Sequence, residues 1–122
     1  MAIVLNGCNP TKSLEGSGNY ELLEPETFAK LLEVKGDSVQ VVDIRTPLEY
    51  KRNHIEGAIN INIISQNFKR KVSELNHSKI IFVYCQTAHR SGYAAKIMVD
   101  KGFEVYELKG GYSAWKEQPG FQ

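Results

Sequence analysis

Residues 79–102 read KIIFVYCQTAHRSGYAAKIMVDKG and decide the fold class. The segment begins with an apolar run, 80–84, whose β-branched and aromatic residues are typical of a strand that is buried on both faces. From Ser91 onward, apolar residues recur at three- and four-residue spacing, which predicts a helix that ends near Gly102. Residues 85–90 form the connecting loop. The segment therefore predicts a strand, loop and helix of an α/β protein.

Cys85 opens this loop and Arg90 closes it. Backbone N–H groups converge at such a place, and the positive end of the helix dipole faces it, so a thiolate is stabilised there. The guanidinium of Arg90 adds a permanent charge that can bind an oxyanion through two hydrogen bonds. The loop therefore predicts a nucleophilic cysteine in an anion-binding site. The alternative is that Cys85 is a small apolar residue of the core, the commonest role of a cysteine thiol.

Four segments resemble the rhodanese-type sulfurtransferases. Cys85, four intervening residues, Arg90 and Ser91 are similar to the active-site loop of that family. The other three segments are VDIR (42–45) followed by Glu49 and Tyr50, HIEGAINI (54–61), and LKGG (108–111) followed by Trp115. Four segments in the family's order indicate more than an isolated Cys-x4-Arg motif. The resemblance implies one copy of the rhodanese-like α/β fold, a five-stranded, mainly parallel sheet with helices on both faces.

The resemblance also implies the chemistry. Cys85 takes a sulfane sulfur from a donor such as thiosulfate or a persulfide, and passes it to cyanide or a thiol acceptor, for which a thioredoxin-like protein is one candidate. Arg90 assists this catalysis. The residues expected to line the anion-binding loop are Gln86, Thr87, Ala88, His89 and Ser91. No metal or cofactor is expected, because the cysteine itself carries the sulfur.

Some loop residues depart from the family pattern. Ala88 occupies a position that is often glycine, and a positive φ there costs an alanine about 1 kcal/mol. Gln86 and His89 make the mouth of the loop less cationic than a strongly basic loop would be. We therefore expect weak turnover of thiosulfate, and a protein persulfide or a low-molecular-weight persulfide is the alternative donor.

Asp43, Arg45 and His54 are further candidates for chemistry. Asp43 and Arg45 lie near the end of the expected strand 39–44, and the resemblance implies that they pair to support the edge of the active site. His54 has no cysteine or second histidine at ligand spacing, which predicts a hydrogen-bonded structural histidine and no metal site. Asn53 stands where the family usually has glycine, and we expect a turn with positive φ there.

Two other functions remain open. A cysteine phosphatase uses the same kind of anion-binding loop, but with one more residue to hold a phosphate group. The four residues between Cys85 and Arg90 favour sulfur transfer. A sulfur-carrier or partner-binding rhodanese module with weak catalysis is the second alternative. The intact pair of Cys85 and Arg90 argues against a purely inert module.

The composition describes an ordinary globular domain. The 122 residues are 42% hydrophobic, and 15 basic and 14 acidic residues leave a net charge of +1. No dense basic block indicates nucleic acid or an anionic membrane as a partner, and no membrane span is expected. The basic run 69–71 is a solvated face or an anionic docking patch. Cys8 and Cys85 are too few for a disulfide framework and are expected to be thiols.

The expected domain covers residues 20–117, between a flexible lead (1–19) and a frayed end (118–122). Further strands are expected at 20–23, 39–44, 58–63 and 103–108, with helices after Glu24, after Thr46, over 65–76 and around Trp115. The segment 5–8 faintly resembles a lipoprotein cleavage site, but no charged or adequate apolar region precedes it. A cytoplasmic location is expected. A lipid anchor at Cys8 in the cell envelope is the alternative, if the chain was trimmed from a longer precursor.

Overall fold

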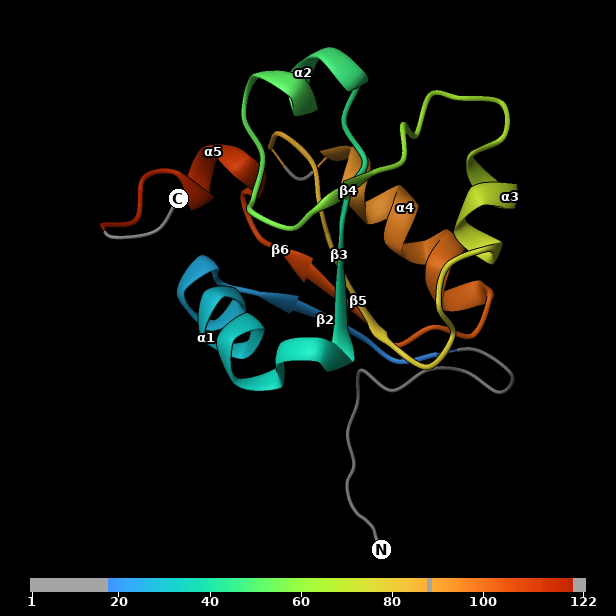
Figure 1. The fold of residues 1–122 in the computed structure, drawn as a ribbon, viewed down its shortest axis with the longest axis horizontal. Coiled ribbons are helices and arrows are strands. Elements are labelled where there is room, and N and C mark those ends of the chain that lie inside the picture. Colours follow the sequence, from blue (N-terminus) through green and yellow to red (C-terminus); the bar gives the residue numbers. More distant parts are fainter. Residues whose placement is uncertain (1–17, 88, 120–122) are drawn as a thin grey trace, which may run out of the picture.

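The computed structural model describes residues 18–87 and 89–119 and contains a five-stranded sheet (Figure 1). The order of the strands across the sheet is β2-β6-β5-β3-β4, and all four neighbouring pairs are parallel. The strands are β2 (Tyr20–Leu23), β3 (Val39–Asp43), β4 (Ile59–Asn60), β5 (Ile80–Tyr84) and β6 (Val105–Leu108). The predicted five-stranded, mainly parallel sheet is confirmed, with β5 at its centre.

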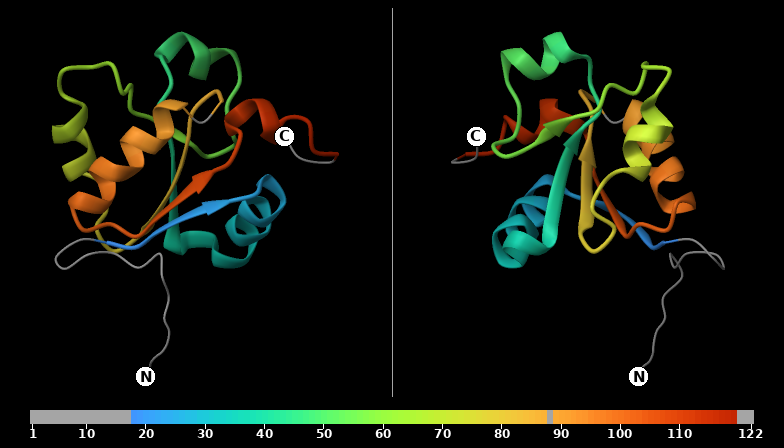
Figure 2. Two further views of the ribbon diagram at one scale, coloured as in Figure 1. Left: turned by 180° about the vertical axis from the view of Figure 1, so that it is seen from behind. Right: turned by 45° about the vertical axis from the view of Figure 1, so that its right-hand side comes forward.

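Helices cover both faces of this sheet, as predicted. They are α1 (Pro25–Lys35), followed by the 3-10 turn η1 (Gly36–Ser38), α2 (Pro47–Arg52), α3 (Phe68–Ser73), α4 (His89–Asp100) and α5 (Gly111–Trp115). Figure 2 shows α1 and α5 on one face and α3 and α4 on the other, while α2 lies beyond the carboxyl ends of the strands. None of the described helices is both long and apolar enough to cross a membrane.

The central strand β5 separates two halves of the core. Its side chains alternate between the faces because successive residues of a strand point in opposite directions. Ile81, Val83 and then Cys85 join the apolar cluster that includes Met98 of α4. Phe82 and Tyr84 join a second cluster that includes Phe28 of α1 and Trp115 of α5. An unbroken apolar run therefore forms a strand that is buried on both faces, as expected.

The boundaries of several elements differ from the sequence-based expectation. Helix α4 begins at His89, two residues before the expected start, because its first turn carries polar residues that an apolar pattern does not reveal. Strand β4 pairs with β3 only at residues 59–60, at the edge of the sheet. Helix α3 is shorter than the expected 65–76, since Ser65 and Asn67 form a hydrogen-bonded turn before it.

The segment after α2 corrects one backbone prediction. The helix expected after Thr46 is present as α2, and Thr46 and Glu49 form a capping box at its start. Asn53, however, has φ −162° and ψ 144°, so the prediction of a positive φ at this residue was wrong. An extended residue here carries the chain away from the helix, and its carbonyl accepts a hydrogen bond from Arg45. The positive φ, +85°, belongs to Gly57 further along.

Candidate functional site

Cys85 lies directly after β5, at the carboxyl edge of the sheet, where α4 begins four residues later. Its side chain is 1% exposed and carries a thiol that packs in the same cluster as Val83 and Ala94. This burial agrees with the alternative interpretation, in which Cys85 is an apolar residue of the core. The position, between a central strand and the first turn of a helix, agrees with the predicted nucleophile.

The loop after Cys85 is bound to α5 through its carbonyl groups. The N–H of Tyr112 donates to the carbonyl of Cys85 at 2.7 Å, and the N–H of Ser113 donates to that of Gln86 at 3.0 Å. A trans peptide directs its N–H opposite to its C=O, and the described peptides contain no cis bond. The N–H groups of Gln86 and Thr87 therefore point away from α5.

Gly111 makes this contact sterically possible. Its φ is +65°, and a Cβ at this position would lie 2.5 Å from the carbonyl oxygen of Cys85 and 2.6 Å from the carbonyl carbon of Gln86. Only a residue without a side chain allows the two backbones to approach so closely. Gly111 therefore allows the backbone of α5 to lie directly against the Cys85 loop.

Arg90, in the first turn of α4, forms an ion pair with Glu49 of α2. Its Nη1 and Nη2 atoms donate to Oε1 and Oε2 of Glu49 at 3.2 and 3.1 Å. These hydrogen bonds lower the pKa of Glu49 from its ordinary 4.5 to about 2. The pKa of Arg90 is raised, first by Glu49 and to a smaller extent by the charge of Cys85. Arg90 is thus close enough to Cys85 to interact with it electrostatically.

Asp43 and Arg45 form the expected ion pair, which is buried. The Arg45 guanidinium donates to both oxygens of Asp43, with Nη2 2.7 Å from Oδ2. Tyr84 donates a further hydrogen bond to Asp43 at 2.7 Å and accepts one from the N–H of Ile55. Burial, together with the charge of Asp43, raises the pKa of Tyr84 well above its ordinary value. Asp43 therefore has its charge neutralised inside the protein.

Gln86 connects this pair to the loop. Its Oε1 accepts a hydrogen bond from Nη1 of Arg45 at 2.8 Å, and its Nε2 donates to Oγ of Ser113 at 3.0 Å. Thr87 and His89 are exposed, and Ala88 lies outside the described residues. The side chain of Gln86 therefore links the loop to Arg45, which follows β3, and to Ser113 of α5.

The hydroxyl of Ser91 is directed into the protein. It donates to Oε2 of Glu107 on β6 at 2.7 Å, and Tyr20 of β2 donates to the other oxygen at 2.5 Å. Glu107 is only 3% exposed. Sequence reasoning did not single it out, although a carboxylate among the apolar residues of an inner strand is a detectable sign of a buried polar contact.

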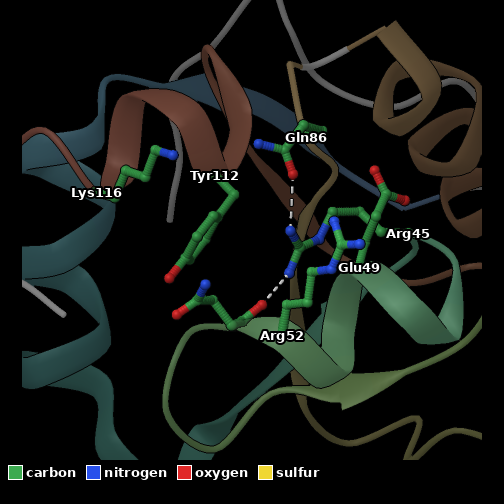
Figure 3. A pocket seen from close by; sticks show the side chains of 7 residues that line it. Arg45, Glu49, Arg52, Gln86, Tyr112 and Lys116 are labelled. Carbon is green, nitrogen blue, oxygen red and sulfur yellow. Dashed lines mark hydrogen bonds between the residues drawn. The ribbon is translucent and has the colours of Figure 1, made fainter.

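A pocket of about 300 Å³ opens beside the loop, between α2 and α5 (Figure 3). Its lining residues are Arg45, Glu49, Arg52, Asn53, Gln86, Tyr112 and Lys116. The guanidinium of Arg45 also lies over the ring of Tyr112, with 4.7 Å from its carbon to the ring centroid. Sequence reasoning missed this pocket because its residues come from three stretches that are far apart in the sequence, 45–53, 86 and 112–116.

His54 behaves as the expected structural histidine. Its Nδ1 lies 2.7 Å from the carbonyl of Tyr50, and the two rings stack with their centroids 3.8 Å apart. In residues 18–87 and 89–119, no group of three or more His, Cys, Asp or Glu residues is arranged to hold a metal ion.

Comparison with known proteins identifies relatives of this chain. The model of the rhodanese-like domain family matches residues 24–118. The thiosulfate sulfurtransferase GlpE of Shewanella oneidensis is 33% identical over 100 residues, which are 81% of this chain and 95% of that protein. The uncharacterized protein YqhL of Bacillus subtilis is 39% identical over 77 residues, 62% of this chain, and the match spans only 60% of YqhL. A rhodanese-related protein from Thermoplasma volcanium has the same fold, with a TM-score of 0.73, 24% identity and coverage of 84% of this chain and 96% of that one.

Proposed function

Since this chain belongs to the rhodanese-like domain family, we propose that it moves a sulfane sulfur from a donor anion to a thiol or cyanide through a persulfide on Cys85. The observation that carries the proposal is the position of Cys85. It lies between the central strand and the first turn of α4, which carries Arg90. Helix dipole, loop amides and guanidinium all favour a negative charge at this place.

The first half of the reaction loads the cysteine. The Cys85 thiolate attacks the outer sulfur of thiosulfate, a sulfur–sulfur bond forms, and sulfite leaves with the electron pair of the bond that breaks. Arg90 stabilises the departing anion. A guanidinium has five N–H donors and Glu49 accepts from two of its nitrogen atoms, so donors remain for an incoming oxyanion. The N–H groups that point away from α5 support the same role.

The second half unloads the cysteine. A thiolate or cyanide attacks the terminal sulfur of the persulfide, and the electron pair of the broken bond returns to the Cys85 sulfur. No external oxidant or reductant takes part. Asp43 and Arg45 hold Gln86 in place through the hydrogen bond from Arg45, so their part in the reaction is to position the loop.

Intact mass spectrometry tests the proposal. After incubation with thiosulfate, we expect the protein to gain the mass of one sulfur atom and to lose it again on addition of cyanide. Cys85→Ser should gain nothing, while the matched variant Cys8→Ser should gain as much as the parent protein. Uptake of sulfur by Cys85→Ser would contradict the proposal. Turnover of an aryl phosphate without uptake of sulfur would favour a phosphatase instead.

The near-complete burial of Cys85 supports a second candidate, a sulfur carrier that turns over slowly. A buried persulfide is protected from solvent and is released only when an acceptor docks. The two functions differ in rate. A carrier gains the sulfur in the mass experiment but shows little steady-state turnover with thiosulfate and cyanide, whereas an efficient transferase shows both.

A further inference from the structure

The pocket between α2 and α5 carries an excess of positive charge. Arg45 is neutralised by Asp43, and Glu49 by Arg90. The two remaining charged residues of the lining, Arg52 and Lys116, form no ion pair with any other residue of the described ranges 18–87 and 89–119, and both are exposed. Two positive charges are therefore available to a ligand in this pocket.

The pocket borders the proposed reaction centre. Gln86, which directly follows Cys85, forms part of its wall, and Tyr112 of the wall donates its N–H to the carbonyl of Cys85. Glu49, which also lines the pocket, is the partner of Arg90. Figure 3 shows these side chains around one hollow, with Arg52 and Glu49 on the α2 side and Tyr112 and Lys116 on the α5 side. A molecule in the pocket thus lies beside the Cys85 loop.

The size and the donors of the pocket restrict its ligand. A volume of about 300 Å³ lies at the lower end for small-molecule sites, which suits a compact molecule rather than a large cofactor. A guanidinium binds a carboxylate through two parallel hydrogen bonds, and an ammonium adds a point charge. Two separated cations, one on each side of the hollow, match a molecule with more than one carboxylate.

We propose that this pocket binds the carboxylates of a low-molecular-weight acidic thiol, which accepts the sulfur from Cys85. The inference rests on the proposed function. Arg52 and Lys116 hold the acidic part of the molecule, and its thiolate attacks the terminal sulfur of the Cys85 persulfide. The bond between the two sulfurs of that persulfide breaks, its electron pair stays on Cys85, and the acceptor leaves as a persulfide. The anion site at Arg90 and this acceptor site are then separate, with Gln86 and Glu49 between them.

Competing acceptors test the proposal. Protein that has been loaded with sulfur is offered mercaptosuccinate, which has a thiol and two carboxylates, or 2-mercaptoethanol, which has a thiol and no charge. The ratio of the two transfer rates is measured in the parent protein and in the double variant Arg52→Gln, Lys116→Gln. We expect the ratio to fall about fivefold to tenfold in the double variant, because two charge contacts of exposed groups are lost.

The matched control is the double variant Lys51→Gln, Lys69→Gln. It removes the same number of charges from exposed positions outside the pocket, so the ratio should not change. An equal fall in both double variants would mean that only the net charge matters and would overturn the proposal. An unchanged ratio in the Arg52→Gln, Lys116→Gln protein would also overturn it.

A binding measurement separates this inference from the proposed function. Succinate, which lacks a thiol, is titrated into Cys85→Ser protein, and the backbone amide resonances of residues 52 and 116 are followed by nuclear magnetic resonance. We expect shifts that saturate and that are lost in the Arg52→Gln, Lys116→Gln background. Sulfur uptake without succinate binding overturns the acceptor site alone. Succinate binding without any sulfur uptake overturns the proposed function, and with it the role of the pocket as an acceptor site.

Discussion

The guanidinium of Arg90 forms two hydrogen bonds with the carboxylate of Glu49, at 3.2 Å from Nη1 to Oε1 and 3.1 Å from Nη2 to Oε2. The pair joins the first turn of α4 to α2, which is held in turn by the capping box of Thr46 and Glu49. One carboxylate therefore caps α2 and orients the guanidinium of Arg90 in the first turn of α4. The two hydrogen bonds therefore fix the direction of the charged Arg90 side chain.

The pair predicts a specific dependence of stability on pH. Because the pKa of Glu49 is lowered in the folded protein, from 4.5 to about 2, its stabilising effect is fully present above pH 4.5 and is lost as the pH falls toward 2. Glu49→Gln removes this effect. We expect the free energy of unfolding to drop by about 1 kcal/mol at pH 7, from the lost ion pair and cap.

The difference between the parent protein and Glu49→Gln should therefore shrink below pH 4.5, as measured by urea unfolding between pH 7 and pH 3. Glu74→Gln is the control, since its ion pair with Arg70 is exposed on both sides and contributes little. A difference that stays constant down to pH 3 would show that the carboxylate charge does not stabilise this junction.

The buried pair of Asp43 and Arg45 predicts a large loss of stability. Asp43→Asn leaves the guanidinium of Arg45, whose side chain is 3% exposed, without its counter-charge, and turns an acceptor of Tyr84 into a competing donor. We expect the free energy of unfolding to fall by about 3–5 kcal/mol. Asp100→Asn, in the exposed pair with Lys96, should change the free energy of unfolding by about 0.5 kcal/mol or less. Similar effects of the two variants in urea unfolding would contradict the buried pair.

The hydrogen bond from Tyr20 to Glu107 predicts a smaller loss. Burial, followed by the hydrogen bond to Glu107, raises the pKa of Tyr20 well above its ordinary value, so the hydroxyl stays a donor at neutral pH. Tyr20→Phe leaves one oxygen of the buried carboxylate without this donor and should cost about 1–3 kcal/mol. Tyr93→Phe, at a side chain that is 61% exposed, should cost about 0.5 kcal/mol or less. Equal losses in the free energy of unfolding for Tyr20→Phe and Tyr93→Phe, measured with denaturant, would show that the Tyr20 hydroxyl does not stabilise Glu107.

The close approach of Gly111 to the Cys85 loop predicts a combined loss of stability and activity. Gly111→Ala places a Cβ against the carbonyl of Cys85 and must displace backbone, whereas Gly57→Ala, at φ +85°, meets no atom within 4 Å. Gly57→Ala should lower the free energy of unfolding by about 1–2 kcal/mol from backbone strain alone. Gly111→Ala should lower it by about 1–3 kcal/mol more, because its Cβ also displaces backbone.

Sulfur uptake by mass spectrometry should slow only in Gly111→Ala, because that variant displaces the loop. Gly57→Ala serves as the control for strain at a positive φ away from the loop. Normal uptake in a folded Gly111→Ala protein would show that the loop tolerates this displacement.

The fold was largely predictable because each element depends on a local pattern. The apolar run of β5 and the Thr46–Glu49 capping box follow from neighbouring residues. The errors fall where local patterns carry little information. The polar first turn of α4, the two-residue edge strand β4 and the extended backbone of Asn53 depend on contacts with segments far along the chain.

The sequence alone determined the succession of strands and helices along the chain and the position of Cys85 at a strand-to-helix junction. Both follow from hydrophobic periodicity and helix capping, which act over a few residues. Only the tertiary structure decided that Glu49 binds Arg90, that Glu107 accepts from Ser91, and that Arg52 and Lys116 face one pocket. These contacts join residues from different elements, and no spacing along the chain specifies them. Packing the helices on the sheet brings these side chains together.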